Sequence, residues 1–201
     1  DALATAGQLE TGEAVLVNAA SSGVGVAALQ LARLLGASPV IGVSTTSAKL
    51  EALARLGIAP DHGFVGDDPD LVDRLIDATG GRGVGVTVDS VGGPAWATNL
   101  ASAALGGRIV SVGRVGGNDA TVNLDEVARK RVSLVGVTFR TRDAAQASAV
   151  VAGFAAAGLA AIADGRLRPV VHRTYPLESA AAAQADLGTN QHVGKLVLEV
   201  S

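Results

Sequence analysis

The stretch from residue 14 to residue 35 constrains the fold of this chain more than any other. It begins with a short apolar run, Val15–Val17, of the kind that forms a central parallel strand. The turn Ala19–Gly25 contains nothing larger than valine, so a ligand's phosphates could approach its backbone closely. A helical periodicity then runs from Gly23 to Leu35. A strand that enters a helix through such a turn is typical of a dinucleotide site.

The turn departs from the G-x-G-x-x-G spacing of many dinucleotide sites. Ala20, Ser22 and Gly25 stand at the three glycine positions. Small residues also occur wherever a helix packs tightly on a strand, so close packing alone is a second interpretation of the turn. Its place between an apolar strand and a helix favours a nucleotide, because the first amides of the helix would point at the phosphates.

The end of the next apolar run bears on the kind of nucleotide. A site for NAD places a carboxylate about 20 residues past the turn, where it accepts the ribose 2′-hydroxyl. Here the run ends in Val43-Ser-Thr-Thr-Ser-Ala-Lys49 and offers no acid. Hydroxyls and an ammonium suit a 2′-phosphate, so we expect NADP(H). The alternative is that residues 44–47 form only a loop and a helix cap at Ser47, with Lys49 in solvent.

Strand and helix patterns alternate along most of the chain, which predicts an α/β fold with a doubly wound, parallel, six-stranded sheet. The expected strands are 15–17, 39–43, 63–65, 83–89, 108–112 and 133–137. The expected helices are 23–35, 47–56, 70–79, 94–105 and 124–131.

The two ends of the chain carry different patterns. Residues 1–9 look like the end of a helix, and with residues up to 168 they are expected to form one dinucleotide-binding domain. Its last helix, Ala144–Ala163, is uncharged but mostly alanine, so we expect it to pack on a sheet and not to cross a membrane. Residues 169–201 form a C-terminal tail, with extended segments at 170–175 and 195–200 and a helix at 178–187.

Composition excludes several classes of function. A formal net charge of −3 gives no electrostatic case for binding nucleic acid or an anionic membrane. The absence of cysteine excludes disulfides, a cysteine nucleophile and a thiolate zinc site. His62, His172 and His192 lack metal-ligand spacing, so we expect no metal site. Nothing suggests secretion, and we expect a cytoplasmic location. The chain starts at Asp1 without an initiator methionine, so we expect a processed or excised polypeptide.

An ordered set of motifs resembles the cofactor half of the medium-chain dehydrogenases/reductases, in their zinc-free quinone oxidoreductase and enoyl reductase branch. The motifs are Asn18-Ala-Ala-Ser-Ser-Gly-Val-Gly25, Lys49 ahead of Leu56-Gly57, Asp89-Ser-Val-Gly-Gly93, Gly106-Gly-Arg-Ile-Val-Ser-Val-Gly113 and His192-Val-Gly-Lys-Leu-Val-Leu198. The resemblance covers almost the whole chain. It implies a Rossmann sheet that binds NADPH and delivers hydride to a quinone or an α,β-unsaturated carbonyl or enoyl acceptor.

The resemblance also implies where each part of the cofactor lies. The pyrophosphate would lie at Ser22, Gly23, Val24 and Gly25. The 2′-phosphate would lie at Ser44 and Lys49, the adenosine at Ser90 and Val91, and Asn190 near the phosphates. The residues expected to line the nicotinamide, largely through their backbone, are Val112, Gly113, Arg114, Val137, Thr138 and Phe139.

Part of the expected enzyme is missing from this chain. The family places a GroES-like substrate domain before this region, and the C-terminal tail would ordinarily join it. That domain supplies most of the acceptor pocket and any proton donor, so no catalytic residue is assigned here. Without it, the tail segments could pair with each other, swap, or pack on another chain. The apolar edge strand Val132–Phe139 is expected to form a homodimer. The competing hypothesis is a non-catalytic module that binds a nucleotide or serves assembly.

Overall fold

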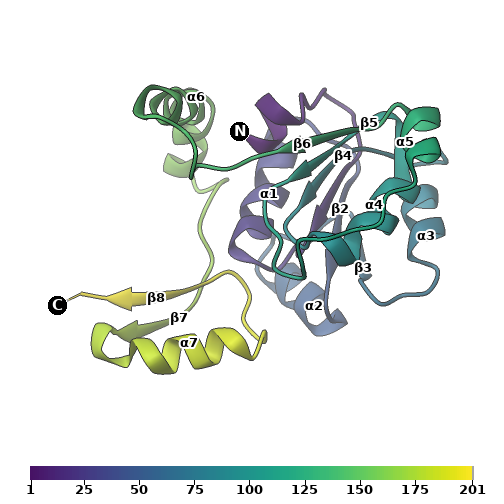
Figure 1. Cartoon of the computed structure of the whole chain (residues 1–201). Helices are drawn as coiled ribbons and strands as arrows, with labels where there is room; N and C mark the ends of the chain where they lie inside the picture. Colours follow the sequence, from purple (N-terminus) through teal and green to yellow (C-terminus); the bar gives the residue numbers. More distant parts are fainter. Residues whose placement is uncertain (201) are drawn as a thin grey trace.

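The computed structural model describes residues 1–200, and within them the expected doubly wound α/β fold is confirmed. Six parallel strands form one sheet in the order β3-β2-β1-β4-β5-β6 (Figure 1). The strands are β1 (Val15–Asn18), β2 (Val40–Ser44), β3 (His62–Val65), β4 (Val84–Asp89), β5 (Ala103–Ser111) and β6 (Ser133–Gly136). The helices between them are α1 (Gly23–Leu34), α2 (Ser47–Arg55), α3 (Leu71–Ala78), α4 (Trp96–Ser102) and α5 (Leu124–Lys130).

The central strands are buried on both sides, which explains their continuous apolar runs. On one face, α1 and α2 pack on alternate residues such as Val15, Val17 and Val86. On the other face, α3 packs on Leu16 and Ile41. Helices α4 and α5 continue this second layer, with their own cluster that includes Trp96, Leu100, Ile109 and Val132. Figure 1 shows α3, α4 and α5 on one side of the sheet and α1 on the other.

Several boundaries differ from the expectation, among them the following three. The fourth helix ends at Ser102 instead of residue 105, because Ala103 already pairs with Val84 in the sheet before a shift in register. Helix α2 is capped by Thr46, whose side chain accepts from the amide of Lys49, so the expected cap at Ser47 is wrong by one residue. The N-terminal segment holds a single short turn, Ala2–Ala6, instead of a longer helix.

Arg108 fixes this N-terminal segment to the sheet. Its guanidinium donates to the backbone oxygens of Gly7 and Gln8, at 2.7 and 3.0 Å. It also forms a two-pronged ion pair with the carboxylate of Glu13, at 2.8 and 2.6 Å. A planar guanidinium suits such simultaneous contacts, so Arg108 of β5 fixes the segment that precedes β1.

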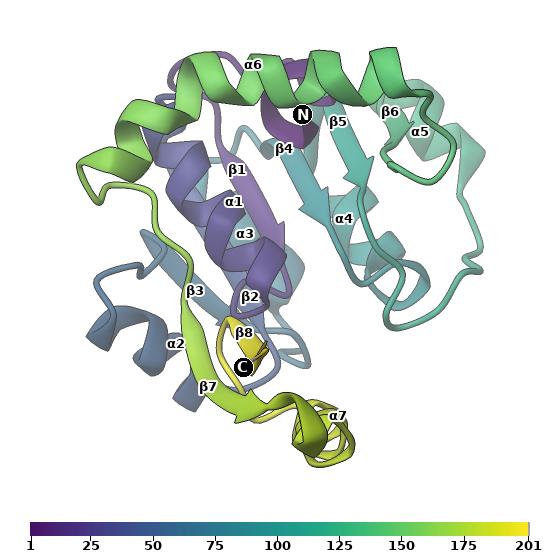
Figure 2. The same cartoon turned by 90° about the vertical axis from the view of Figure 1, so that its left-hand side faces the viewer.

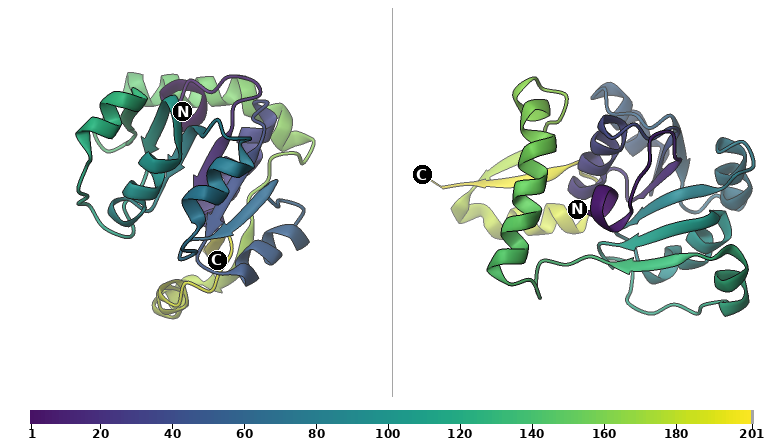
Figure 3. Two further views of the ribbon diagram at one scale, coloured as in Figure 1. Left: turned by 90° about the vertical axis from the view of Figure 1, so that its right-hand side faces the viewer. Right: turned by 90° about the horizontal axis from the view of Figure 1, so that it is seen from above.

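Helix α6 (Ala144–Ala163) was expected to pack on the sheet, and this expectation is wrong. It crosses the end of the molecule that lies opposite α7 (Figures 2 and 3). Ala161 is buried, but the larger apolar side chains are substantially exposed, between 37% and 60%: Val151, Phe154, Leu159 and Ile162. These apolar residues are few among alanines, and their spacing along the helix does not indicate which other element would pack on them. No helix among the described residues combines the length and apolar character needed to cross a membrane.

The C-terminal tail forms a second, two-stranded sheet. Strand β7 (Val171–Pro176) and strand β8 (Lys195–Glu199) pair in parallel, joined by helix α7 (Ala180–Gly188). Of the arrangements left open by the sequence, the structure therefore has the two segments paired with each other. The tail is fastened to the main domain beside α1 and α2, as Figure 2 shows. The amide of Gly194 donates to the Ser21 oxygen at 2.8 Å, and both amide atoms of Gln30 bond the backbone of Arg168 at 3.0 Å.

Candidate cofactor site

The strand order places a crevice at the carboxyl ends of β1 and β4. Chain connections run outward from this point in both directions, first through β2 and β3 and later through β5 and β6. In such sheets, ligands bind outside the strand ends where the order reverses. The register brings Asn18, Asp89 and Ser111, the last residues of three adjacent strands, to this edge.

The turn after β1 is shaped for a ligand that lies directly on the backbone. Ser22 caps α1, its hydroxyl accepting from the amide of Gly25 at 3.0 Å. A Cβ on Gly25 would overlap the carbonyl oxygen of Ala19, so only glycine allows the helix to start this close to the strand. Ala19 itself has a φ of +52°, which costs energy for a residue with a side chain. These features fit a pyrophosphate at the first amides of α1.

The tail completes the wall of this turn. The hydrogen bond from the amide of Gly194 to the backbone oxygen of Ser21 is part of an isolated parallel bridge between Gly194 and Ser22. The side chain of the next residue, Lys195, lies over Gly23: a Cβ there would be 3.0 Å from its ammonium nitrogen. A cation therefore lies next to the N-terminus of α1, where anions are already favoured. The sequence motif pointed to Gly194-Lys195, but Lys195 was not among the predicted site residues.

The end of β2 holds the residues expected at a 2′-phosphate. Ser44 is buried, and its hydroxyl shares a hydrogen bond of 3.0 Å with that of Ser21, so it supports the turn from beneath. Lys49 is also buried rather than in solvent, with 6% of its surface exposed. Its ammonium donates to the side-chain oxygen of Asn190 at 2.6 Å. Burial lowers the pKa of Lys49.

A cavity of about 450 Å³ adjoins Lys49, between α2 and the tail. Its polar and charged lining comes from both elements: Thr46, Lys49, Arg55, His172 and Gln191. The imidazole of His172 lies 6.4 Å, centroid to centroid, from that of His192. Nitrogen Nδ1 of His192 is buried without a hydrogen-bond partner among the described residues. Neither histidine was singled out by spacing, because the sequence does not show that both lie near Lys49.

A buried polar network supports the end of β4. The side-chain nitrogen of Asn18 donates to Asn99 at 2.7 Å and, less directly, to Asp89 at 3.4 Å. The carboxylate of Asp89 also accepts from the amides of Val91 and Gly92, at 2.9 and 3.2 Å. This fixes the loop that carries Ser90, whose buried hydroxyl has no partner within residues 1–200. An unpaired buried hydroxyl at a crevice suits a ligand with polar groups.

The ends of β5 and β6 form the remaining wall. The amides of Val112 and Gly113 both donate to the backbone oxygen of Asp89, at 2.8 and 3.1 Å. Val112, Gly113 and Val137 are half-buried, whereas Arg114, Thr138 and Phe139 are exposed. The Phe139 ring is 54% exposed, with the Arg142 guanidinium 5.3 Å from its centroid.

The predicted site residues thus lie in two groups at the carboxyl ends of the strands. The turn, the Ser90 loop and the ends of β5 and β6 lie along the β1/β4 edge, while Lys49 and Asn190 meet over the end of β2. The network of Asn18 and Asn99 was missed, since its members are 81 residues apart and nothing in the local sequence links them.

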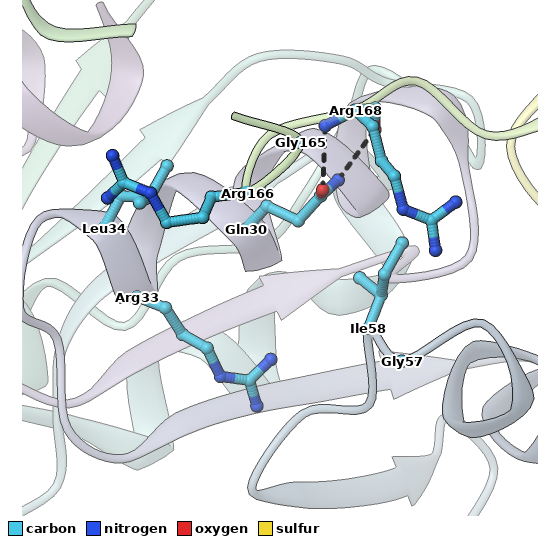
Figure 4. Close-up of a pocket in the computed structure, with 8 residues that line it drawn as sticks. All are labelled: Gln30, Arg33, Leu34, Gly57, Ile58, Gly165, Arg166 and Arg168. Atoms are coloured by element: carbon cyan, nitrogen blue, oxygen red, sulfur yellow. Dashed lines mark hydrogen bonds between the residues drawn. The ribbon is translucent and has the colours of Figure 1, made fainter. Parts of the chain in front are cut away.

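A second cavity, of about 350 Å³, lies at the far end of α1 and is shown in Figure 4. Three guanidinium groups surround it, from Arg33, Arg166 and Arg168. Figure 4 shows them pointing in different directions. The side-chain amide of Gln30 forms two hydrogen bonds with the backbone of Arg168. Arg33 and Arg166 are paired with Asp61 and Asp164, at 2.9 and 2.7 Å. The bonds that tie this segment to α1 and to the end of α2 are those of Arg168, with Gln30 and with the backbone oxygen of Leu56.

The side chains present do not suit zinc. Within residues 1–200, no three His, Cys, Asp or Glu side chains are grouped so that they could hold a metal ion. The chain has no cysteine at all. The residues present therefore do not fit a zinc centre within this chain.

Comparison with known proteins agrees with this geometry. Residues 23–153 match the family model described as zinc-binding dehydrogenase. The highly reducing polyketide synthase cm3B of Cordyceps militaris is 32% identical over 99% of this chain, which spans 8% of that protein. Acryloyl-coenzyme A reductase of Metallosphaera sedula is 31% identical over 94% of this chain and 52% of its own length. The chain thus spans a small part of the first of these relatives and about half of the second.

Solved structures give the same result. The quinone oxidoreductase of Thermus thermophilus, studied also in complex with NADPH, has a TM-score of 0.84 and 27% identity, over 99% of this chain and 61% of that one. An NAD-dependent alcohol dehydrogenase has a TM-score of 0.84 and 31% identity, over 100% of this chain and 54% of that one. The chain belongs to the zinc-binding dehydrogenase family, within the medium-chain dehydrogenases/reductases, and corresponds to the cofactor-binding half of that family.

Proposed function

We propose that this chain is the NADPH-binding part of an oxidoreductase that transfers hydride to a quinone or to an α,β-unsaturated carbonyl or enoyl acceptor. The observation that carries the proposal is the pairing of two features at one sheet edge. The glycine-dependent turn at Gly25 opens α1 toward the crevice, and the buried ammonium of Lys49 lies over the end of β2. A dinucleotide with an extra phosphate on its adenosine ribose suits both.

The preference for NADP(H) rests on charge. Strand β2 ends in Ser44 and is followed by Thr45 and Thr46, so no carboxylate is available there for a ribose 2′-hydroxyl. Lys49 has an amide oxygen, not a carboxylate, as its hydrogen-bond partner. Among residues 1–200 this buried cation is hydrogen-bonded to a neutral group alone, so it would gain from a phosphate. Solved relatives of both nucleotide classes have this fold, so the fold alone does not decide between them.

The chain's own residues would bind and orient the cofactor. The amides at Ser22–Gly25 and the Lys195 ammonium would hold the pyrophosphate, and Ser90 with Val91 the adenosine ribose. Backbone groups of Val112 and Gly113 would position the nicotinamide, with Val137, Thr138, Phe139 and Arg114 at its side. The bound cofactor supplies the hydride, and the protein supplies orientation and exclusion of water. The acceptor is reached from the half of the family fold that this chain does not include.

We further propose that this protein is zinc-independent, homodimeric and cytoplasmic. The resemblance to quinone oxidoreductases and the cysteine-free donor set support a zinc-free branch. The exposed edge strand β6 supports a homodimer, since Leu134 is 60% exposed there. A cytoplasmic location follows from the proposed activity and stays a prediction.

Titration of the chain with NADPH and with NADH tests the cofactor assignment. We expect saturable binding of both, with NADPH bound more tightly. Lys49→Gln should weaken NADPH by about 10- to 100-fold, as expected for a lost hydrogen bond to a charged group, and leave NADH little changed. Arg129→Gln is the matched control, because it removes one positive charge from the exposed end of α5. Absence of saturable binding, or a preference for NADH, would contradict the proposal.

A further inference from the structure

Two histidines of the tail lie beside the end of α2 that carries Lys49. His172 is on β7 and lines the same cavity as Lys49, and His192 lies in the connection from α7 to β8. The two imidazole rings are 6.4 Å apart, with planes inclined at 69°. The amide of Val193 donates a long hydrogen bond of 3.5 Å to Nδ1 of His172. Nδ1 of His192 is buried and has no partner among the described residues.

The titratable groups around His192 are mostly bases. Lys49 faces it from α2 and His172 from β7, and Arg55 of α2 lines the adjoining cavity. Asp186 of α7 is the carboxylate that faces it. That carboxylate is already committed, because it accepts from the Tyr175 hydroxyl at 2.7 Å and from Arg173 at 3.1 Å.

The protonation of His192 follows from these surroundings. Burial, and then the nearby Lys49 and His172, lower the pKa of His192, with Asp186 opposing them. The ring is therefore neutral at pH 7 in the free chain. An anion placed at Lys49 would reverse the sign of the neighbouring charge and favour the protonated ring.

We propose that Lys49, His172 and His192 form one anion-binding subsite, which takes the 2′-phosphate of NADP(H) as a dianion and gains a proton from solvent on His192, so that the preference for NADP(H) over NAD(H) depends on pH. This inference rests on the proposed cofactor assignment. It adds two residues of the tail to the determinants of specificity. It also explains why Nδ1 of His192 is buried without a partner among the described residues: that nitrogen would take up the proton.

The affinity for the 2′-phosphate depends on pH because His192 has a different pKa in the free chain and in the complex. Proton uptake occurs between the lower pKa of His192 in the free chain and its higher pKa in the complex. Affinity for the 2′-phosphate therefore rises as the pH falls through the higher of these two values. The phosphate itself gains a proton near pH 6, which limits the gain on the acid side. The change should amount to about tenfold in the dissociation constant for each unit by which the pKa is raised.

Isothermal titration calorimetry with 2′,5′-ADP and 5′-AMP isolates this phosphate, because the two probes differ only there. We would measure both in buffers of different ionisation enthalpy near pH 7, and then from about pH 8.5 to about pH 6.5. We expect uptake of a fraction of a proton with 2′,5′-ADP and none with 5′-AMP. The ratio of the two dissociation constants should change in favour of 2′,5′-ADP by about tenfold over this range.

His192→Gln identifies the residue that takes the proton. The amide can donate a hydrogen bond but cannot take up a proton, so the proton uptake seen with the parent chain should disappear, with 5′-AMP binding unchanged. His62→Gln, on the exposed start of β3, is the matched control and should behave as the parent chain. If His192→Gln does not fold, as judged by circular dichroism, the uptake by the parent chain decides the question.

The outcomes separate this inference from the one it rests on. Tighter binding of 2′,5′-ADP with a flat pH profile would overturn the subsite proposal and leave NADP(H) specificity standing. Equal proton uptake by His192→Gln and the parent chain would also overturn it, because the proton would then reside on a group other than His192. If 2′,5′-ADP binds no more tightly than 5′-AMP, both proposals fail.

Discussion

Lys49 on α2 and Asn190 after α7 are 141 residues apart in sequence, and the ammonium of one lies 2.6 Å from the side-chain oxygen of the other. This hydrogen bond joins the tail to the end of β2. Asn190 has a φ of +53°, in the left-handed region that asparagine tolerates better than most residues. Asn190 therefore serves in two ways at this position: it tolerates the left-handed backbone, and its side-chain oxygen accepts from Lys49.

Substitution of Asn190 separates these two properties. Asn190→Gly keeps the left-handed backbone and removes the oxygen, so we expect a loss of about 1–2 kcal/mol in the free energy of unfolding. Asn190→Ala removes the oxygen and also strains the backbone, which should cost about 1 kcal/mol more. Urea unfolding of both variants measures the difference. Equal stability of the two variants would show that the backbone conformation adds nothing.

Gly25→Ala should damage the turn more than Gly23→Ala does. At position 25 the new methyl group would meet the backbone oxygen of Ala19, which cannot move without moving the turn. At position 23 it would meet the Lys195 side chain at 2.9 Å, and that flexible chain can shift. We expect Gly25→Ala to cost about 1–3 kcal/mol and to weaken NADPH binding more than tenfold. Thermal unfolding and a nucleotide titration of the two variants provide the comparison.

The Glu13–Arg108 pair should make stability depend on acid pH. Hydrogen bonds from Arg108 lower the pKa of Glu13 below its ordinary value of about 4.3. The stability that the pair contributes is therefore fully present above that value and is lost as the pH falls through the lower pKa of the folded chain. Glu13→Gln should lose about 1 kcal/mol at pH 7 and show a shallower decline below about pH 4.3.

The exposed residue Glu51 offers a matched control for that experiment. Its pair with Arg55 spans 3.8 Å, and its side chain is 68% exposed. Glu51→Gln should leave both the stability at pH 7 and the acid decline as in the parent chain. A decline that is the same in Glu13→Gln and in the parent would show that Glu13 is not the group responsible.

Strand β6 is expected to hold a homodimer together. It ends the sheet, and Leu134 presents a half-exposed apolar side chain there. Leu134→Lys should shift the chain toward the monomer in sedimentation equilibrium at micromolar concentration. Leu159→Lys makes the same change on α6, where the side chain is 56% exposed, and should leave the dimer intact. A parent chain that is monomeric at this concentration would contradict the prediction.

The sheet could be predicted because each of its central strands has a local pattern of its own. Val15–Val17 is apolar without interruption, as a strand buried on both faces must be, and the turn after it has to be built from small residues. The end of α4 was harder to predict from the sequence, since no glycine or proline marks the end of the helix at Ser102. Only the pairing of Ala103 with Val84, a long-range contact, stops the helix there.

The site divides in the same way. The turn and Lys49 could be identified from the sequence, because the turn is local and the missing acid is a property of one strand end. That Lys49 is buried depends on Asn190 and on the tail, which no local pattern indicates. The exposure of Phe154 on α6 escaped prediction for a similar reason, since an apolar periodicity shows which side chains could be buried but not whether anything covers them.

The attachment of the tail has a consequence for the order in which this molecule can mature during synthesis. A nascent chain that has emerged as far as α6 already contains every strand of the large sheet, so that sheet could form while translation continues. The phosphate-binding wall could not form at that point, because Gly194, which bonds Ser21, and Lys195, which lies over Gly23, come after α6 and α7 in the chain. Competence to hold a nucleotide would therefore follow formation of the sheet and would wait until β8 docks beside the turn.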